Sequence, residues 1–105
     1  MIFEALQKWV DAIRPLFPHN ASFETDRRGD FIVRIHWESG CEWVVSPLVR
    51  IIIVEETIDR CRDFDLAGEA FQQDIENRIT RLNDTYGWAW PHPVEEWRIT
   101  PKIIR

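Results

Sequence analysis

Apolar residues recur at helical spacing over the first part of the chain. They are Ile2, Phe3, Leu6, Trp9, Val10 and Ile13, with Glu4 and Lys8 four residues apart on the opposite face. Positions three and four residues apart share one side of a helix. The pattern predicts an amphipathic helix over residues 2–14, which Pro15 and Pro18 end.

Alternating positions follow, in which every second residue is suited to one face, and this is typical of half-buried strands. The alternating positions are Phe23 and Thr25, and then Phe31, Val33, Ile35 and Trp37. A loop Arg27-Arg28-Gly29 suits a three-residue turn that ends in glycine. It predicts a hairpin in which Thr25 pairs with Phe31 and Phe23 with Val33, all on one face.

The next turn gives two conflicting signals. Ser39-Gly40 suggests a two-residue loop, whereas the alternation requires a loop over 39–41, with Trp37 opposite Trp43 and Ile35 opposite Val45. A slip of one residue would expose both tryptophans. We therefore expect the longer loop and a strand over 42–46.

Residues 48–55 can be read in two ways. Ser46-Pro47 could begin a helix, but a nearly continuous run of β-branched residues favours a strand. We predict a strand with two apolar faces, one formed by Val49, Ile51 and Ile53 and the other by Leu48, Ile52 and Val54. The helical alternative stays open at this stage.

The second half of the chain predicts a short helical turn over 57–62 and a longer helix from a cap at Asp65 to about Asn83. Residues 97–100 could add a final edge strand. The expected fold of residues 1–105 is a single α+β domain, an antiparallel sheet of three or four strands with two main helices packed on one face, in the order α-β-β-β-α.

The net charge of −5 and the two cysteines limit the function. An acidic chain repels polyanions on average. Cys41 and Cys61 lie outside any disulfide or metal spacing, the first residues do not resemble a signal peptide, and no apolar run could span a membrane. We expect reduced thiols, a cytoplasmic location and no membrane partner.

No stretch carries a catalytic, metal or phosphate motif of useful specificity. His19, His36 and His92 are scattered, the adjacent carboxylate pairs at 55–56 and 95–96 would point apart on a strand, and the four glycines are dispersed. The sequence predicts no enzyme, no cofactor and no metal site.

The helix, three-strand, helix order resembles that of double-stranded RNA-binding domains. In that family the second long helix begins with a lysine cluster that binds phosphates. The corresponding residues here are Asp63, Asp65 and Glu69, and no lysine occurs between Lys8 and Lys102. The resemblance therefore implies a topology but not nucleic-acid binding, and Arg27 and Arg28 leave a weak nucleic-acid binder as an alternative.

The segment 86–97 is the richest in tryptophan. Trp88, Trp90 and Trp97 accompany His92, which lies between two prolines. Tryptophans close small cores and also anchor protein interfaces. We expect this segment to contribute Trp88, Trp90, His92 and Trp97 to partner binding, although it could instead cover the core.

These expectations combine into a non-catalytic protein-binding module that self-associates, with a protein partner of unknown identity. A sheet covered by helices on one face leaves its other face open, and that face would carry Leu48, Ile52, Val54 and Ile32 as a homodimer interface. The alternative is an acidic protein, similar in size and charge to inhibitor, immunity or secretion-chaperone proteins, that binds a basic partner.

Overall fold

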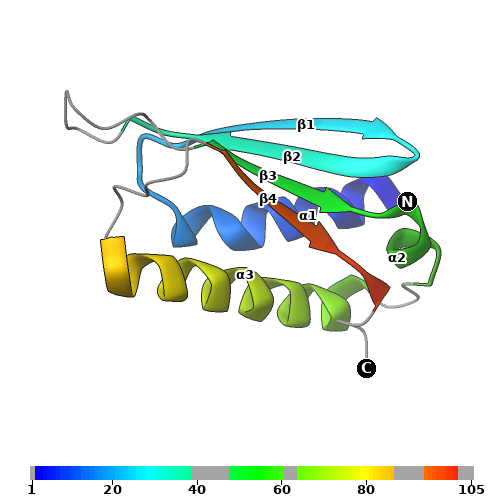
Figure 1. Cartoon of the computed structure of the whole chain (residues 1–105). Helices are drawn as coiled ribbons and strands as arrows, with labels where there is room; N and C mark the ends of the chain where they lie inside the picture. The colour runs from blue at the N-terminus through cyan, green and yellow to red at the C-terminus, as the bar shows by residue number, and fades with distance from the viewer. Residues whose placement is uncertain (1, 39–47, 61–63, 87–93, 102–105) are drawn as a thin grey trace.

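Three α-helices and four strands make up the described chain. A computed structural model describes residues 2–38, 48–60, 64–86 and 94–101. The elements, shown in Figure 1, are α1 (Ile2–Ile13), the 3-10 helix η1 (Arg14–Leu16), β1 (Ser22–Arg28), β2 (Asp30–His36), β3 (Leu48–Ile53), α2 (Glu55–Arg60), α3 (Phe64–Tyr86) and β4 (Val94–Ile99). The α+β class and the two main helices are confirmed.

The strand interpretation of residues 48–55 is also confirmed, over Leu48–Ile53. The strand is shorter than predicted because α2 begins at Glu55, where the Asp30 carboxylate accepts the Glu55 backbone N–H at 2.8 Å. This capping group comes from β2, so the local sequence does not reveal it. Helix α3 is longer than predicted and begins at Phe64, so that Asp65 lies inside the helix.

The sheet has the order β1-β2-β3-β4. β1 with β2 and β2 with β3 are antiparallel, as expected, but β4 runs parallel to β3. Parallel neighbours need a long crossover connection, usually helical. Helices α2 and α3 lie in the connection here, and the prediction of a wholly antiparallel sheet missed this final strand direction.

The predicted hairpin register is wrong by two residues. Thr25 pairs with Val33 and Phe23 with Ile35, because only Gly29 separates the last pair, Arg28 and Asp30. A shift of two residues keeps every side chain on its face. The predicted faces of β1 and β2 are therefore correct although the turn is tighter.

The partner of β2 also differs from the prediction. Ile35 pairs with Val49 of β3 and not with Val45. Trp43, Val45 and the rest of the predicted strand 42–46 lie outside the described residues, as do Cys41, Cys61, Trp88, Trp90 and His92.

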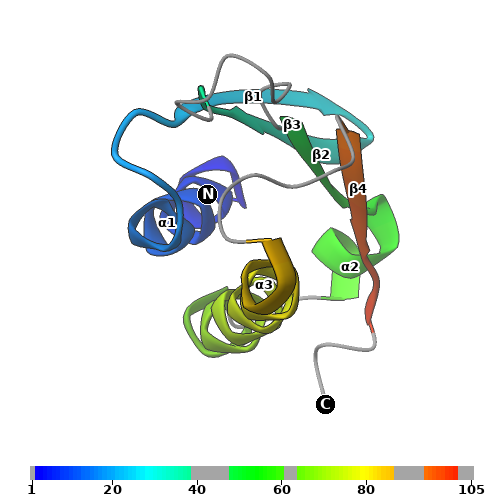
Figure 2. The ribbon, with the colours of Figure 1, turned by 60° about the vertical axis from the view of Figure 1, so that its left-hand side comes forward.

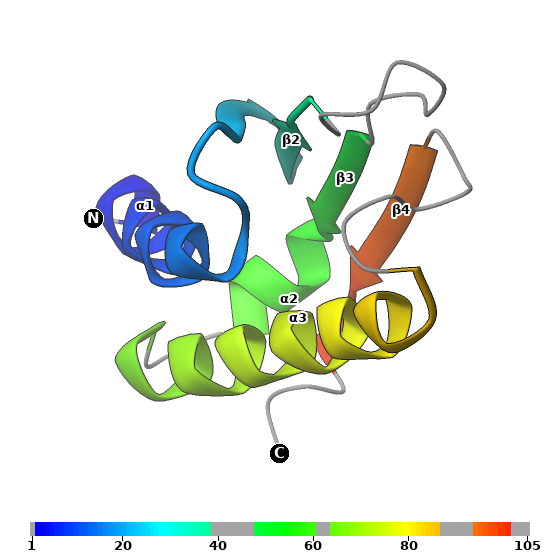
Figure 3. The same cartoon turned by 90° about the vertical axis from the view of Figure 1, so that its left-hand side faces the viewer.

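All three α-helices lie on the same face of the sheet (Figures 2 and 3). The core between the layers contains Phe31, Val33, Ile35, Val49, Ile51, Ile53, Trp97 and Ile99 from the strands and Leu6, Trp9, Val10, Ile13, Ile58, Phe71, Ile75 and Ile79 from the helices. Trp9 stacks on Phe71 with ring centroids 4.9 Å apart. Gly68 permits this close approach of α1 and α3, since a Cβ there would lie 3.2 Å from Trp9 Nε1.

One backbone carbonyl joins β3, α2 and β4. The Ile99 oxygen accepts the Val54 N–H at 3.2 Å and the buried Thr57 hydroxyl at 2.9 Å. A buried side-chain donor needs such a partner. The contact fixes the end of β4 beside the end of β3.

Gly29 gives a direct test of the hairpin. Its φ of 75° is unfavourable for residues with a Cβ, and a Cβ would lie 3.3 Å from Glu55 Oε2. We expect Gly29→Ala to lower the free energy of unfolding by about 1 kcal/mol. Gly29→Asn should lose less, because asparagine tolerates this conformation better. Urea denaturation measures both, and an alanine variant as stable as the wild type would contradict the turn geometry.

Candidate functional site

The face of the sheet away from the helices, called here the open face, is the candidate site. Alternation along the strands places on it Ser22, Glu24, Asp26 and Arg28 of β1, Asp30, Ile32, Arg34 and His36 of β2, Leu48, Arg50 and Ile52 of β3, and Val94, Glu96 and Arg98 of β4. None of the described helices covers it (Figures 2 and 3). A surface of this kind is a normal place for a partner to bind.

The predicted apolar patch is present on this face. Ile32 and Ile52 are directly paired across β2 and β3, and Leu48 lies on the same face of β3. Ile52 is only 7% exposed, whereas Ile32 and Leu48 are half-buried. Val54, the fourth predicted residue, follows the end of β3, and its N–H donates a hydrogen bond to the Ile99 carbonyl. The structure thus brings three of the four residues together.

A row of charged residues crosses the open face beside this patch. Its members, in the order of the strands, are Glu24, Arg34, Arg50 and Glu96. Arg34 and Arg50 are direct cross-strand partners, an arrangement that is unfavourable for like charges. Because the two arginines repel each other, an additional negative charge at the centre of the face would be favourable.

Arg34 and Arg50 have hydrogen-bond donors without an acceptor in the described structure. Arg50 Nη1 donates to Glu96 Oε2 at 3.3 Å, but Arg50 Nε is buried and has no hydrogen-bond partner. Within the described chain Arg34 makes no hydrogen bond or ion pair. A buried donor without an acceptor is costly. An external acceptor would not reach the buried Nε, but it would meet the accessible part of Arg50, whose side chain is 39% exposed, and Arg34 beside it.

The sequence analysis did not single out Arg34 and Arg50. Each alternates with core residues and was interpreted only as an outward-facing polar position. Their adjacency depends on the pairing of β2 with β3, and the predicted pairing of β2 with residues 42–46 separated them. A correct register would have shown the pair.

Charge is balanced on the open face, in contrast to the chain as a whole. The face carries the basic residues Arg28, Arg34, Arg50 and Arg98 and the acidic residues Glu24, Asp26, Asp30 and Glu96, whereas the chain has a net charge of −5. The acidic excess therefore lies elsewhere. A partner that approaches the open face does not meet the average negative field of the protein.

The hairpin arginines are engaged locally. Arg27 Nε donates to the Gly29 carbonyl at 3.2 Å, and Arg28 Nε contacts Asp26 Oδ2 at 3.1 Å. Arg28 remains 84% exposed, so its ion pair is weak. The acidic neighbour nevertheless reduces the local positive charge that an anion would meet.

Trp97 lies in the core and not on the surface. Its side chain is 4% exposed on the helix side of β4, and the Arg78 guanidinium carbon lies 5.9 Å from the ring centroid. A partner would not reach this ring in the structure. Trp88, Trp90 and His92, which were predicted to join it in partner binding, lie outside the described residues.

The described residues hold no group of three or more histidine, cysteine or acidic side chains placed to bind a metal ion. Among the described helices none is both long and apolar enough to cross a membrane.

In comparisons with known proteins, no family model matches the chain, and no curated protein or solved structure is significantly similar to it. The function has to be argued from the residues themselves.

The net charge and the local partners of Arg27 and Arg28 generate a prediction about nucleic acids. We expect no more than weak, nonspecific binding of duplex DNA or RNA at physiological salt, because few phosphates could be neutralised. Fluorescence anisotropy with labelled duplexes measures this. Submicromolar, sequence-selective binding that is lost when Arg27 and Arg28 are both changed to alanine would contradict the expectation.

Proposed function

We propose that the protein is a small, non-catalytic, cytoplasmic protein-binding module whose open face binds a partner protein. The observation that carries the proposal is the pair of arginines at the centre of that face, which are direct cross-strand partners. A carboxylate of the partner would bind the accessible part of their guanidinium groups and offset the repulsion between Arg34 and Arg50.

The apolar residues beside the arginines define the rest of the partner. Half-buried Ile32 lies one row away along the strands, beside Ile52, which at 7% exposed adds little surface. Half-buried Leu48 and the 49% exposed Val94 lie on the other side. Burial of apolar surface contributes roughly 25 cal/mol per Å² before the costs of association. The face therefore fits a segment that carries a carboxylate between apolar side chains.

Self-association by stacking two open faces is less favourable. A twofold axis along the strands, between β2 and β3, would place Arg34 of one copy over Arg50 of the other. Like charges brought together in an interface disfavour it. The homodimer interface predicted at Leu48, Ile52, Val54 and Ile32 thus becomes, in our proposal, the surface for a different protein.

The acidic alternative has one observation in its favour. Because the open face is balanced, the excess negative charge lies on the remaining surface, which includes Glu55, Glu56 and Asp59 of the exposed side of α2. An inhibitor or chaperone-like protein could bind a basic partner there. Its association rate would fall steeply as ionic strength rises.

A charge reversal at Arg34 tests the open face. Arg34 has no ion pair to lose among the described residues, and a glutamate there would face Arg50 on one side and Glu24 on the other. The attraction to Arg50 offsets the repulsion from Glu24, so Arg34→Glu should fold, which circular dichroism checks. Arg81→Glu, on the exposed side of α3, makes the same change in net charge on the helical side. Each immobilised protein is exposed to native lysate, and the retained proteins are quantified by mass spectrometry.

We expect a partner that is retained by the wild type and by Arg81→Glu but falls about tenfold or more with Arg34→Glu, because a carboxylate would meet a carboxylate. Equal retention by Arg34→Glu would show that the open face is not the binding surface. Stronger retention by Arg81→Glu, which adds negative charge to the helical side, would favour the acidic alternative.

A further inference from the structure

β4 is an unpaired edge of the described sheet. Strand order ends there, and the Ile99 carbonyl points to the β3 side, where it accepts the Val54 N–H. Backbone groups of successive residues in a strand point in opposite directions within the sheet. The N–H and C=O groups of Glu96 and Arg98 therefore point away from β3 and are free to pair with another strand.

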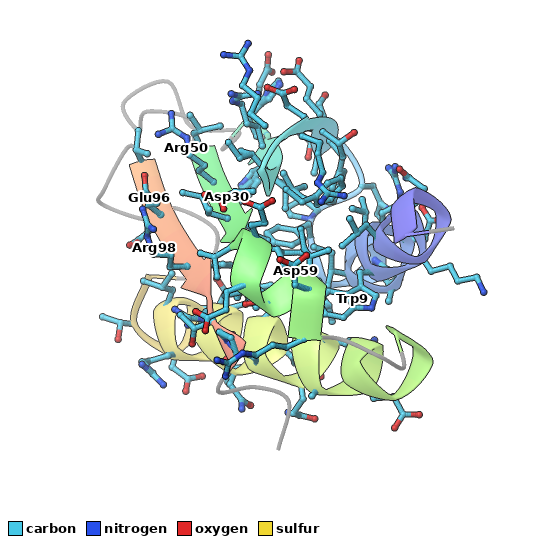
Figure 4. The ribbon with its side chains drawn as sticks, turned by 90° about the vertical axis from the view of Figure 1, so that its right-hand side faces the viewer. Trp9, Asp30, Arg50, Asp59, Glu96 and Arg98 are labelled. Carbon is cyan, nitrogen blue, oxygen red and sulfur yellow. The ribbon has the colours of Figure 1, made fainter. Side chains whose placement is uncertain are left out.

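The side chains of the same two residues carry opposite charges. Both are exposed, and they follow one another along β4, with Arg50 beside Glu96 (Figure 4). Glu96 uses Oε2 for its contact with Arg50. Arg98 makes no hydrogen bond or ion pair with the described part of the chain. One acidic and one unpaired basic residue thus flank Trp97 on the free edge.

We propose that a second copy of this chain binds the free edge, with β4 antiparallel to β4 about a twofold axis at Trp97. Glu96 of each copy then lies opposite Arg98 of the other, and their outward N–H and C=O groups form the ladder. The two sheets join into one continuous sheet. The inference goes beyond the proposed function, which concerns the open face, and it leaves that face accessible.

The charges select a single register. A shift of two residues in either direction would place Glu96 opposite Glu96 or Arg98 opposite Arg98. A shift of one would oppose outward-pointing backbone groups to inward-pointing ones and break the ladder. In the proposed register the exposed Val94 lies opposite Thr100, so no like charges meet along the edge.

The other edge of the sheet is less suitable. On β1, Arg28 is already paired with Asp26, and Thr25 and Arg27 are exposed on the helix side of the strand. On β4, Trp97 and Ile99 are buried on that side. A cleft of about 570 Å³ lies between β4 and α3, lined by Arg98, Gln73 and Asn77 among others. Pairing through β4 therefore also brings the helix layers together.

A mixing experiment tests the register directly. Arg98→Glu places glutamate opposite glutamate in a homodimer, and Glu96→Arg places arginine opposite arginine. Each variant alone should dimerise about tenfold or more weakly than the wild type, because two attractive pairs become repulsive. An equimolar mixture of the two should form heterodimers, since both cross-strand pairs are then complementary.

Sedimentation velocity over a concentration series measures the mass of each sample against a monomer of 12.6 kDa, and circular dichroism confirms that the variants are folded. A mixture of Arg81→Glu with Glu96→Arg has the same total charge, but its heterodimer restores only half of the pairs. Arg81→Glu keeps the wild-type edge and should dimerise with itself, so Glu96→Arg should stay largely monomeric in this mixture.

Wild-type monomers at every concentration would overturn the inference, and so would single variants that dimerise as well as the wild type or a complementary mixture that stays monomeric. None of these results would decide the binding of a partner to the open face, which the Arg34→Glu comparison measures independently. Weak single variants together with a heterodimeric mixture support the proposed edge.

Discussion

The parallel pairing of β4 with β3 is the constraint on which the rest of the structure depends. A strand parallel to β3 must start at the same end of the sheet as β3. The chain therefore crosses back over the sheet between β3 and β4, and α2 and α3, which form this crossover, cover one face. The Ile99 carbonyl fixes the end of β4 to the start of the crossover, because it accepts both the Val54 N–H and the Thr57 hydroxyl. Helix α1 packs on the same side through Trp9 and Phe71. Among the described residues, the consequences are a sheet face that no helix covers and an edge at β4 that no strand pairs with.

In our proposals, charge is the reason why these two surfaces bind different partners. The open face has balanced charge in an acidic chain, but its centre holds adjacent arginines. Such a centre disfavours a second copy of the same face and favours a carboxylate. The β4 edge instead presents one acidic and one basic side chain on either side of Trp97. That pattern is complementary to itself when the strand is reversed, so the edge suits a second copy whereas the face suits a different protein.

Local patterns predicted much of the fold. The helical period placed Leu6, Trp9 and Val10 on the buried face of the first helix. Strand alternation assigned the correct faces to β2 and β3, although the hairpin register was wrong by two residues. The direction of β4 could not be read locally, since it depends on the path of a crossover. Trp97 and Ile99 are two residues apart and so share one face of the strand, and this alternation would have predicted that Trp97 lies in the core. The Arg34–Arg50 pair needed the strand pairing, which is a long-range property of the chain.

Amide hydrogen exchange along β4, followed residue by residue by NMR at increasing protein concentration, tests the central claim most directly. At low concentration the N–H groups of Trp97 and Ile99, which face β3, should exchange slowly, and those of Glu96 and Arg98 should exchange fast. As concentration rises, Glu96 and Arg98 should become protected while Trp97 and Ile99 change little. Glu96 and Arg98 amides that are slow at every concentration, or fast at every concentration, would contradict an edge that is free in the monomer and paired between two copies.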